Sequence, residues 1–231
     1  YYTGQAFDMK LITEAAHKKK IIVGFDLAHA VGNLHLKLHD WNIDFAVWCS
    51  YKYLNSGPGG IAGCFVNERF AKDTSLLRFS GWWGHEKKTR FLMGPDFHPI
   101  EGAEGWQLSN PPILALAALR SSLAIFEEAG MEKLSKKSRL LTGYLEYLLD
   151  ELHNDAIQII TPKDPDQRGA QLSIRIKNSN KELFQMLMSD GVICDWREPD
   201  VIRVAPTPLY NSFMDVFQLV QKLKNMLKLF F

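Results

Sequence analysis

Residues 21–26 (IIVGFD) and residues 45–52 (FAVWCSYK) are two apolar segments, and polar side chains, Asp26 and Lys52, stand at their ends. The apolar residues in both are consecutive rather than alternating, which is typical of strands buried on both faces of a parallel sheet. A short helix or turn is expected over residues 28–40, and a third strand over residues 61–66. This order predicts an α/β fold with a mostly parallel sheet.

The chain on either side of these strands predicts two domains. Asp8 is expected to cap a helix that runs through Lys20, and residues 70–109 are irregular and rich in glycine, which indicates a functional or interfacial loop. A helix is expected to start at Asn110-Pro111-Pro112 and to reach Ala129, and others are expected over residues 131–152, over residues 181–189 and from a Ser212 cap to residue 229. Strands are expected over residues 157–160, 171–177, 192–197 and 201–205. The sequence therefore predicts a partial large domain with a connecting helix over residues 1–130 and a small α+β domain over residues 131–231.

The composition excludes several classes of function. Lys and Arg number 27 against 26 Asp and Glu, so no strong field attracts nucleic acid or an anionic membrane. No apolar run approaches the ~18 residues that a membrane helix needs. Three cysteines without a CxxC pair predict a reducing, cytoplasmic compartment. His35 and His39 lack a third ligand, so no metal site is predicted.

The two strand ends predict a chemical site. Ligands bind beyond the carboxyl ends of parallel strands, so Asp26 and Lys52 are expected at one rim. Pyridoxal phosphate needs such a pair, because an amine bonds covalently to its aldehyde while a carboxylate keeps its ring nitrogen protonated. His29 lies one helical turn beyond Asp26, and Tyr51 offers a hydroxyl. By position alone, a strand-end salt bridge or two unrelated surface charges explain Asp26 and Lys52 better than a cofactor site does.

Longer motifs identify a family resemblance. The chain resembles the kynureninase family of fold-type-I pyridoxal-phosphate enzymes at residues 23–30 (VGFDLAHA), 48–55 (WCSYKYLN), 59–63 (GGIAG), 81–86 (GWWGHE), 109–113 (SNPPI), 202–206 (IRVAP) and 208–212 (PLYNS). The resemblance implies the C-terminal part of the large domain followed by the small domain. It implies hydrolytic Cβ–Cγ cleavage of L-kynurenine or 3-hydroxy-L-kynurenine to anthranilate or 3-hydroxyanthranilate and L-alanine, in tryptophan catabolism and de novo NAD biosynthesis.

The resemblance also implies roles for the cofactor-site residues. Lys52 would bond covalently to pyridoxal 5'-phosphate, and Asp26 would pair with its ring nitrogen. His29 and Tyr51 would contact the cofactor, and Tyr51 would also exchange a proton near the substrate carbonyl. The cofactor site would be completed, across a homodimer interface, by Trp82 and Asn110.

For the substrate, the resemblance implies that Ser109 and Asn110 lie near the aryl group and that Arg203 binds the α-carboxylate in a bidentate pair. Arg203 also interrupts an apolar strand, although an outward-facing edge arginine would explain that equally well. Arg175 occupies a similar strand position without a matching motif and is predicted to lie at the surface.

The chain opens on Tyr1 without an initiator Met, and kynureninases carry roughly as much chain again before the matching part. We therefore expect a C-terminal portion that by itself binds the cofactor poorly and turns over little substrate. Two other functions fit the same residues: a related class V aminotransferase or cysteine desulfurase, and a non-catalytic chain that acts by dimerising with an intact one.

Overall fold

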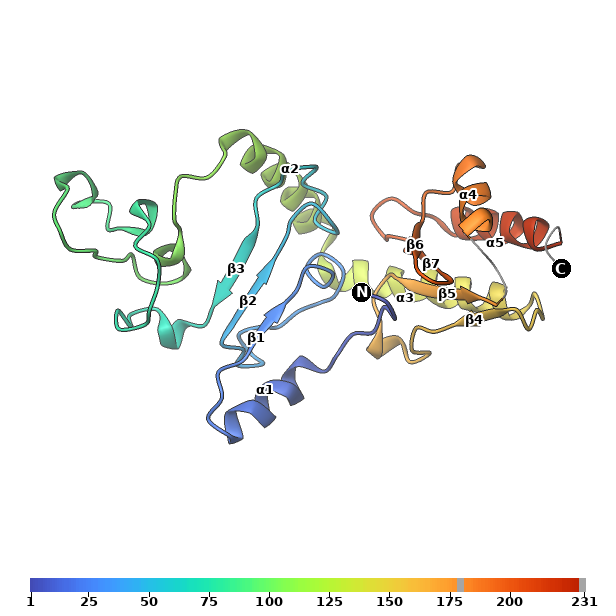
Figure 1. Ribbon diagram of the computed structural model, residues 1–231, viewed down its shortest axis with the longest axis horizontal. Helices are drawn as coiled ribbons and strands as arrows, with labels where there is room; N and C mark the ends of the chain where they lie inside the picture. Colours follow the sequence, from blue (N-terminus) through green and yellow to red (C-terminus); the bar gives the residue numbers. More distant parts are fainter. Residues whose placement is uncertain (178–180, 229–231) are drawn as a thin grey trace. The chain divides into compact units, whose positions relative to one another are not determined.

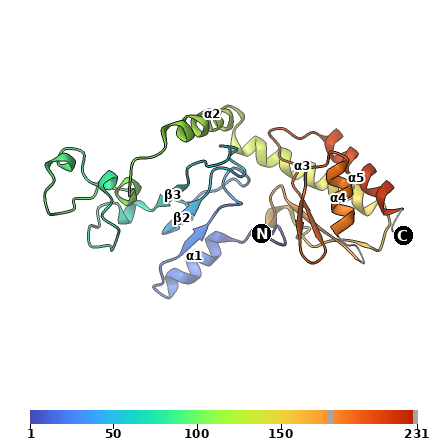
Figure 2. The ribbon, with the colours of Figure 1, turned by 45° about the horizontal axis from the view of Figure 1, so that its top comes forward.

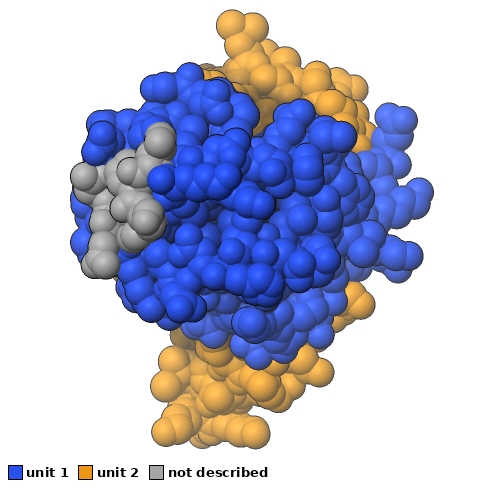
Figure 3. All heavy atoms as spheres, turned by 90° about the vertical axis from the view of Figure 1, so that its right-hand side faces the viewer, with its two compact units in different colours: residues 1–7, 32–35, 127–231 blue, residues 8–31, 36–126 orange. Residues whose placement is uncertain are grey.

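The computed structural model describes residues 1–177 and 181–228. These form two compact units (Figure 3). Unit 1 comprises Tyr1–Phe7, Gly32–His35 and Glu127–Phe231, and unit 2 comprises Asp8–Val31 and Leu36–Phe126. The division into domains of residues 1–130 and 131–231 stays a prediction.

Unit 2 is built on a three-stranded sheet of β1 (Gly24–Asp26), β2 (Phe45–Trp48) and β3 (Gly63–Val66), in the order β1-β2-β3 (Figure 1). β1 and β2 are parallel, and β2 and β3 are antiparallel. Helix α1 (Met9–Lys18) precedes the sheet, and the Asp8 side chain caps it by accepting a hydrogen bond from the Leu11 amide. The expected α/β layer and the expected cap are confirmed.

One face of this sheet is open, and here the predicted burial is wrong. The strand expected over residues 21–25 begins only at Gly24, and Ile21 and Ile22 are 54% and 61% exposed. In β2, Ala46 is fully buried whereas Phe45 and Val47 are exposed. The reason is that successive strand residues point to opposite faces, and one face alone is covered. The buried core of unit 2 includes Met9, Leu27, Ile43 and Ala46.

Unit 1 packs helices on a four-stranded antiparallel sheet of order β4-β5-β7-β6. The elements are α3 (Met131–Asp150), β4 (Ile157–Ile159), β5 (Leu172–Ile176), α4 (Lys181–Ser189), β6 (Asp195–Arg197), β7 (Val201–Val204) and α5 (Phe213–Leu227). The strand expected over residues 192–197 is therefore shorter than predicted. Residue 229, the expected end of the last helix, lies outside the described residues. The core includes Leu141, Leu145, Leu172, Ile176, Leu183, Leu187, Val216 and Val220.

Helix α2 (Ile113–Ala129) leads directly into α3, and Gly130 separates them with a positive φ of 78°. α2 ends at Ala129 as the sequence predicts, because a left-handed residue interrupts the helix and glycine adopts that conformation at little cost. α3 ends at Asp150, before the expected end at residue 152. Across residues 1–177 and 181–228, no helix combines the length and apolarity needed to traverse a bilayer.

Candidate functional site

The loops that follow β1 and β2 lie against each other in unit 2. The Leu27 amide donates to the Val47 carbonyl at 2.8 Å, which continues the parallel pairing past the end of β1. Beyond it, the Cys49 thiol lies 3.9 Å from the Ala28 carbonyl. The rings of His29 and Tyr53 meet edge to face, with centroids 6.5 Å apart. These contacts place the segment 26–29 beside the segment 49–53, the arrangement that parallel strand ends predict.

Asp26 is the last residue of β1, and its carboxylate is exposed but oriented. Its Oδ1 accepts a hydrogen bond from the Ala28 amide at 2.8 Å. This short-range bond is the usual way in which an Asp side chain ends a strand and begins a turn. It fixes the carboxylate at the end of the strand, on the same segment as His29.

Lys52 is held on a turn that neighbouring serines stabilise. The buried Ser50 hydroxyl contacts the Ser56 hydroxyl at 2.7 Å and donates to the Ile61 carbonyl. The Ser56 amide in turn donates to the Ser50 carbonyl at 3.2 Å, and the Asn55 amide donates to the Lys52 carbonyl at 3.0 Å. The backbone at Lys52 is therefore anchored on both sides, while its ammonium group stays exposed to solvent.

Tyr51 lies between the buried Ser50 and Lys52, and its side chain is 53% exposed. Its hydrogen bond with the Cys49 side chain raises the pKa of the phenol above its ordinary value, and the charge of a Cys49 thiolate raises it further. A phenol whose pKa is raised stays protonated at neutral pH and is a donor rather than a base.

Trp82 and the pair Ser109 and Asn110 lie on neighbouring segments of unit 2. The link is the Gly84 amide, which donates to the Gln107 carbonyl at 2.9 Å. The Trp82 ring lies at the surface, 45% exposed, and the Ser109 hydroxyl donates to Asn110 Oδ1 at 3.2 Å. Residues 75–100, coloured teal to green, extend away from β1, β2 and β3 in both views (Figures 1 and 2).

Arg203 lies on β7 in unit 1, with its side chain 10% exposed. It pairs with the Asp195 carboxylate on β6, and Arg203 Nη1 donates to the Tyr1 carbonyl at 2.6 Å. Its Nε is buried without a hydrogen-bond partner among the described residues. Arg175 is partly buried rather than a plain surface residue, because Asp200 and the Tyr2 hydroxyl bind it.

Two acidic residues with several partners in the structure, Asp195 and Asp44, were not predicted from the sequence. Asp195 stands directly opposite Arg203 in the antiparallel register of β6 and β7. The predicted turn between these strands could have revealed this pair. Counting residue pairs outward from that turn along the two strands places Asp195 opposite Arg203. Asp44 is buried and binds His17, Arg69 and the Val23 amide, and no sequence pattern marks it.

The chain is similar to kynureninases along nearly all its residues. Residues 134–223 match the family model of the kynureninase C-terminal domain. Kynureninase from Koribacter versatilis is 60% identical over 222 residues, 96% of this chain and 52% of the relative. Kynureninase from Myxococcus xanthus is 60% identical over 97% of this chain and 53% of the relative. The predicted resemblance to kynureninases is confirmed, and the chain spans about half the length of the curated relatives it matches.

Solved structures confirm the fold. Cysteine desulfurase from Thermococcus onnurineus superposes with a TM-score of 0.78 at 15% identity, covering 97% of this chain and 57% of that one. A C-DES variant with glycine linked covalently to its pyridoxal-phosphate cofactor superposes with a TM-score of 0.79 at 17% identity. The superposition covers 97% of this chain and 58% of that chain. The fold is therefore the fold-type-I arrangement that the motifs predict.

Proposed function

We propose, on the premise that this chain matches kynureninases along nearly its whole length, that it supplies the C-terminal part of a kynureninase active site. The reaction is hydrolytic Cβ–Cγ cleavage of L-kynurenine or its 3-hydroxy form, which releases anthranilate or 3-hydroxyanthranilate and L-alanine. The observation that carries the proposal is the 60% identity to kynureninases. The contacts between the loops of Asp26 and Lys52 support it, because they bring the acid and the amine segments together.

The side chains on these loops fit pyridoxal 5'-phosphate. The cofactor requires an amine for its aldehyde, an anion for its ring nitrogen and hydrogen-bond donors for its phosphate. Lys52, Asp26 and the protonated Tyr51 offer these three kinds of group from two adjoining loops. His29 lies on the same segment as Asp26 and offers a ring for packing or a further hydrogen bond.

When bound, the cofactor supplies a conjugated ring that accepts electrons from the substrate. The protein provides the remaining steps. Lys52 would move the proton at the substrate Cα, and its side chain is exposed on a turn whose backbone is anchored. Asp26 would pair with the protonated ring nitrogen of the cofactor. Tyr51 would donate a proton at the γ-carbonyl oxygen of the substrate. Arg203 binds the α-carboxylate through two parallel N–H donors and so fixes the orientation of the substrate.

The assembly that we propose is a cytoplasmic homodimer. Trp82 and Asn110 would serve the site of the second subunit. For Trp82, this agrees with the extension of residues 75–100 away from β1 and β2. Ser109 would lie with Asn110 near the aryl group of the substrate.

The test is reconstitution with the segment of the Koribacter versatilis kynureninase that this chain does not match. The two polypeptides are co-expressed and supplied with pyridoxal phosphate, and borohydride reduction is followed by peptide mass mapping. We expect the adduct on Lys52, and we expect kynurenine to yield fluorescent anthranilate with alanine. Lys52→Ala abolishes both signals, whereas Lys72→Ala, at a lysine 81% exposed, leaves both unchanged.

Two results would contradict the proposal. An adduct on another lysine would remove Lys52 from the site, and sulfide from cysteine in place of anthranilate would identify a desulfurase. The chain without the added segment is expected to give a weak adduct. Asp26 and Lys52 are both exposed here, and solvent weakens electrostatic binding of the cofactor.

A further inference from the structure

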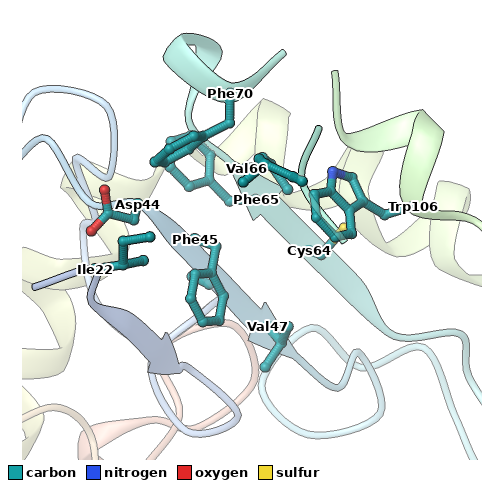
Figure 4. Close-up of a pocket in the computed structure, with 11 residues that line it drawn as sticks. Ile22, Asp44, Phe45, Val47, Cys64, Phe65, Val66, Phe70 and Trp106 are labelled. Atoms are coloured by element: carbon teal, nitrogen blue, oxygen red, sulfur yellow. The ribbon is translucent and has the colours of Figure 1, made fainter. Parts of the chain in front are cut away.

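Two acidic side chains each pair with two basic ones, and their surroundings differ. Asp44 lines an apolar groove of about 380 Å³ in unit 2 (Figure 4), and its side chain is 3% exposed. Its contacts join segments of the fold, so its role is to stabilise them. Asp195, in unit 1, is 42% exposed and pairs with Arg197 and Arg203. Asp195 is therefore the acid whose ion pairs a ligand from solvent can reach.

The guanidinium group of Arg203 is held at both of its terminal nitrogens. Nη2 pairs with the Asp195 carboxylate, and Nη1 donates to the Tyr1 carbonyl at 2.6 Å. The same carbonyl accepts from Gln171 Nε2 at 3.2 Å, so it is anchored as well. These contacts order a flexible side chain before any ligand arrives, which lowers the entropy cost of binding.

Arg203 still has donors left for a ligand. A guanidinium group carries five N–H donors in a rigid fork, and the contacts with Asp195 and Tyr1 use two of them. Nε is buried and has no hydrogen-bond partner among the residues that the structure describes, although an unpaired buried donor is costly. A carboxylate, with two acceptor oxygens, is the group that matches the remaining donors.

The register of the strands fixes this ion pair. Asp195 on β6 lies directly opposite Arg203 on β7, and Ser173 on β5 lies opposite Arg203 on the other side. Such cross-strand neighbours lie close together on one face of a sheet. Arg197, also on β6, binds the same carboxylate at 3.0 Å. Because two arginines face one aspartate, a positive charge remains to attract an anionic ligand.

We propose that Asp195 is a positioning residue, which fixes the guanidinium group of Arg203 for the α-carboxylate of an amino-acid substrate. The proposal rests on the proposed function for the role of Arg203. Without the Asp195 carboxylate, the contact with the Tyr1 carbonyl holds one terminal nitrogen, and the other is free to turn away. A bidentate pair needs two N–H donors fixed in one plane, so the affinity for a carboxylate falls.

The test uses this chain reconstituted with the unmatched segment of the Koribacter versatilis kynureninase and with pyridoxal phosphate. Binding of L-alanine, and of ethylamine, which lacks the carboxylate, is followed by the absorbance of the cofactor. Asp195→Asn should weaken binding of L-alanine about 10-fold and leave that of ethylamine unchanged. In the Arg203→Lys background, Asp195→Asn should have no further effect, because Asp195 acts through Arg203.

The matched control is Asp200→Asn, which breaks the ion pair of Asp200 with Arg175, 3.2 Å long and also in unit 1. This variant should bind both amines like the unchanged chain. A second measurement uses the chain alone. In ¹⁵N NMR spectra the Nη signals of Arg203 should be sharp, because the ion pair slows rotation of the guanidinium group, and Asp195→Asn should broaden them. Circular dichroism should be the same for both.

Several results would overturn the proposal: unchanged affinity for L-alanine, an equal loss for ethylamine, a further loss in the Arg203→Lys background, or unchanged Arg203 signals. Tighter binding of L-alanine by Asp195→Asn would also overturn it, and would show that Asp195 competes with the substrate carboxylate. A reconstituted chain that does not respond to L-alanine would overturn both proposals. A selective loss of L-alanine affinity, with sulfide from cysteine in place of anthranilate, supports the role of Asp195 and contradicts the proposed function alone.

Discussion

Replacing Asp44 by Ala is expected to lower the free energy of unfolding of unit 2 by about 3–5 kcal/mol. Asp44 is buried at the start of β2, which leads to the loop of Lys52. Its carboxylate joins three segments: α1 through His17, the approach to β1 through the Val23 amide, and the 3₁₀ helix η1 (Glu68–Phe70) through Arg69.

The magnitude follows from these three contacts. A hydrogen bond to a charged group contributes about 1.5–3 kcal/mol. The Val23 bond, at 2.7 Å, counts in full, because the backbone amide would be left without its acceptor. The His17 and Arg69 side chains are 28% and 34% exposed, so water compensates part of their loss and they count only in part. The sum agrees with the cost of breaking a buried ion pair.

The assay is urea unfolding combined with hydrogen exchange at the Val23 amide. The Asp44→Ala variant should lose both stability and protection at Val23. The control is Asp40→Ala: this carboxylate is 70% exposed and lies 3.8 Å from His39, so its loss should cost less than about 1 kcal/mol. Equal unfolding free energies for the two variants, or unchanged exchange at Val23, would refute the reasoning.

Three more predictions concern unit 1. Arg203→Lys should raise the KM for kynurenine of the reconstituted enzyme by about 10-fold or more, since Lys lacks the bidentate geometry, and Arg175→Lys should not. Burial, and secondarily the Asp195 charge, raise the pKa of Cys194 to about 11, so its alkylation at pH 8 should run about 100-fold slower than at an ordinary thiol. The rate should increase with pH up to that value, and Asp195→Asn, which removes a negative charge, should lower the pKa. Ser212→Ala should cost about 1 kcal/mol in urea unfolding, because the capping box at α5 is lost.

Two helix N-termini and the end of the first strand were predictable because local chemistry sets them. Asp8 caps α1 through the Leu11 amide, and Ser212 caps α5 through the Asp215 amide, as their positions before apolar helices predict. The capping bonds also hold the pKa of Asp215 below its ordinary value. Asp26 ends β1, and Lys52 follows β2 by a short turn. The roles of these site residues stay predictions.

Side-chain pairing across strands was only partly predictable. The turn between β6 and β7 specifies that Asp195 faces Arg203, yet reading that pair from the chain requires the exact register. The contact between the loops after β1 and β2, through Cys49 and Ala28, joins residues far apart in the chain. Local periodicity has no information about such partners.

By itself, the sequence determined which helices and strands form and in what order, which ionisable groups follow the strands, and which family the motifs resemble. The tertiary structure alone decided that Phe45 and Val47 lie on an open face while Ala46 is fully buried. The physical reason is that a run of apolar residues records a tendency to be buried, whereas burial itself depends on what packs across the sheet. The same reasoning explains Asp44, whose burial is compatible with its charge only because three distant segments converge on it.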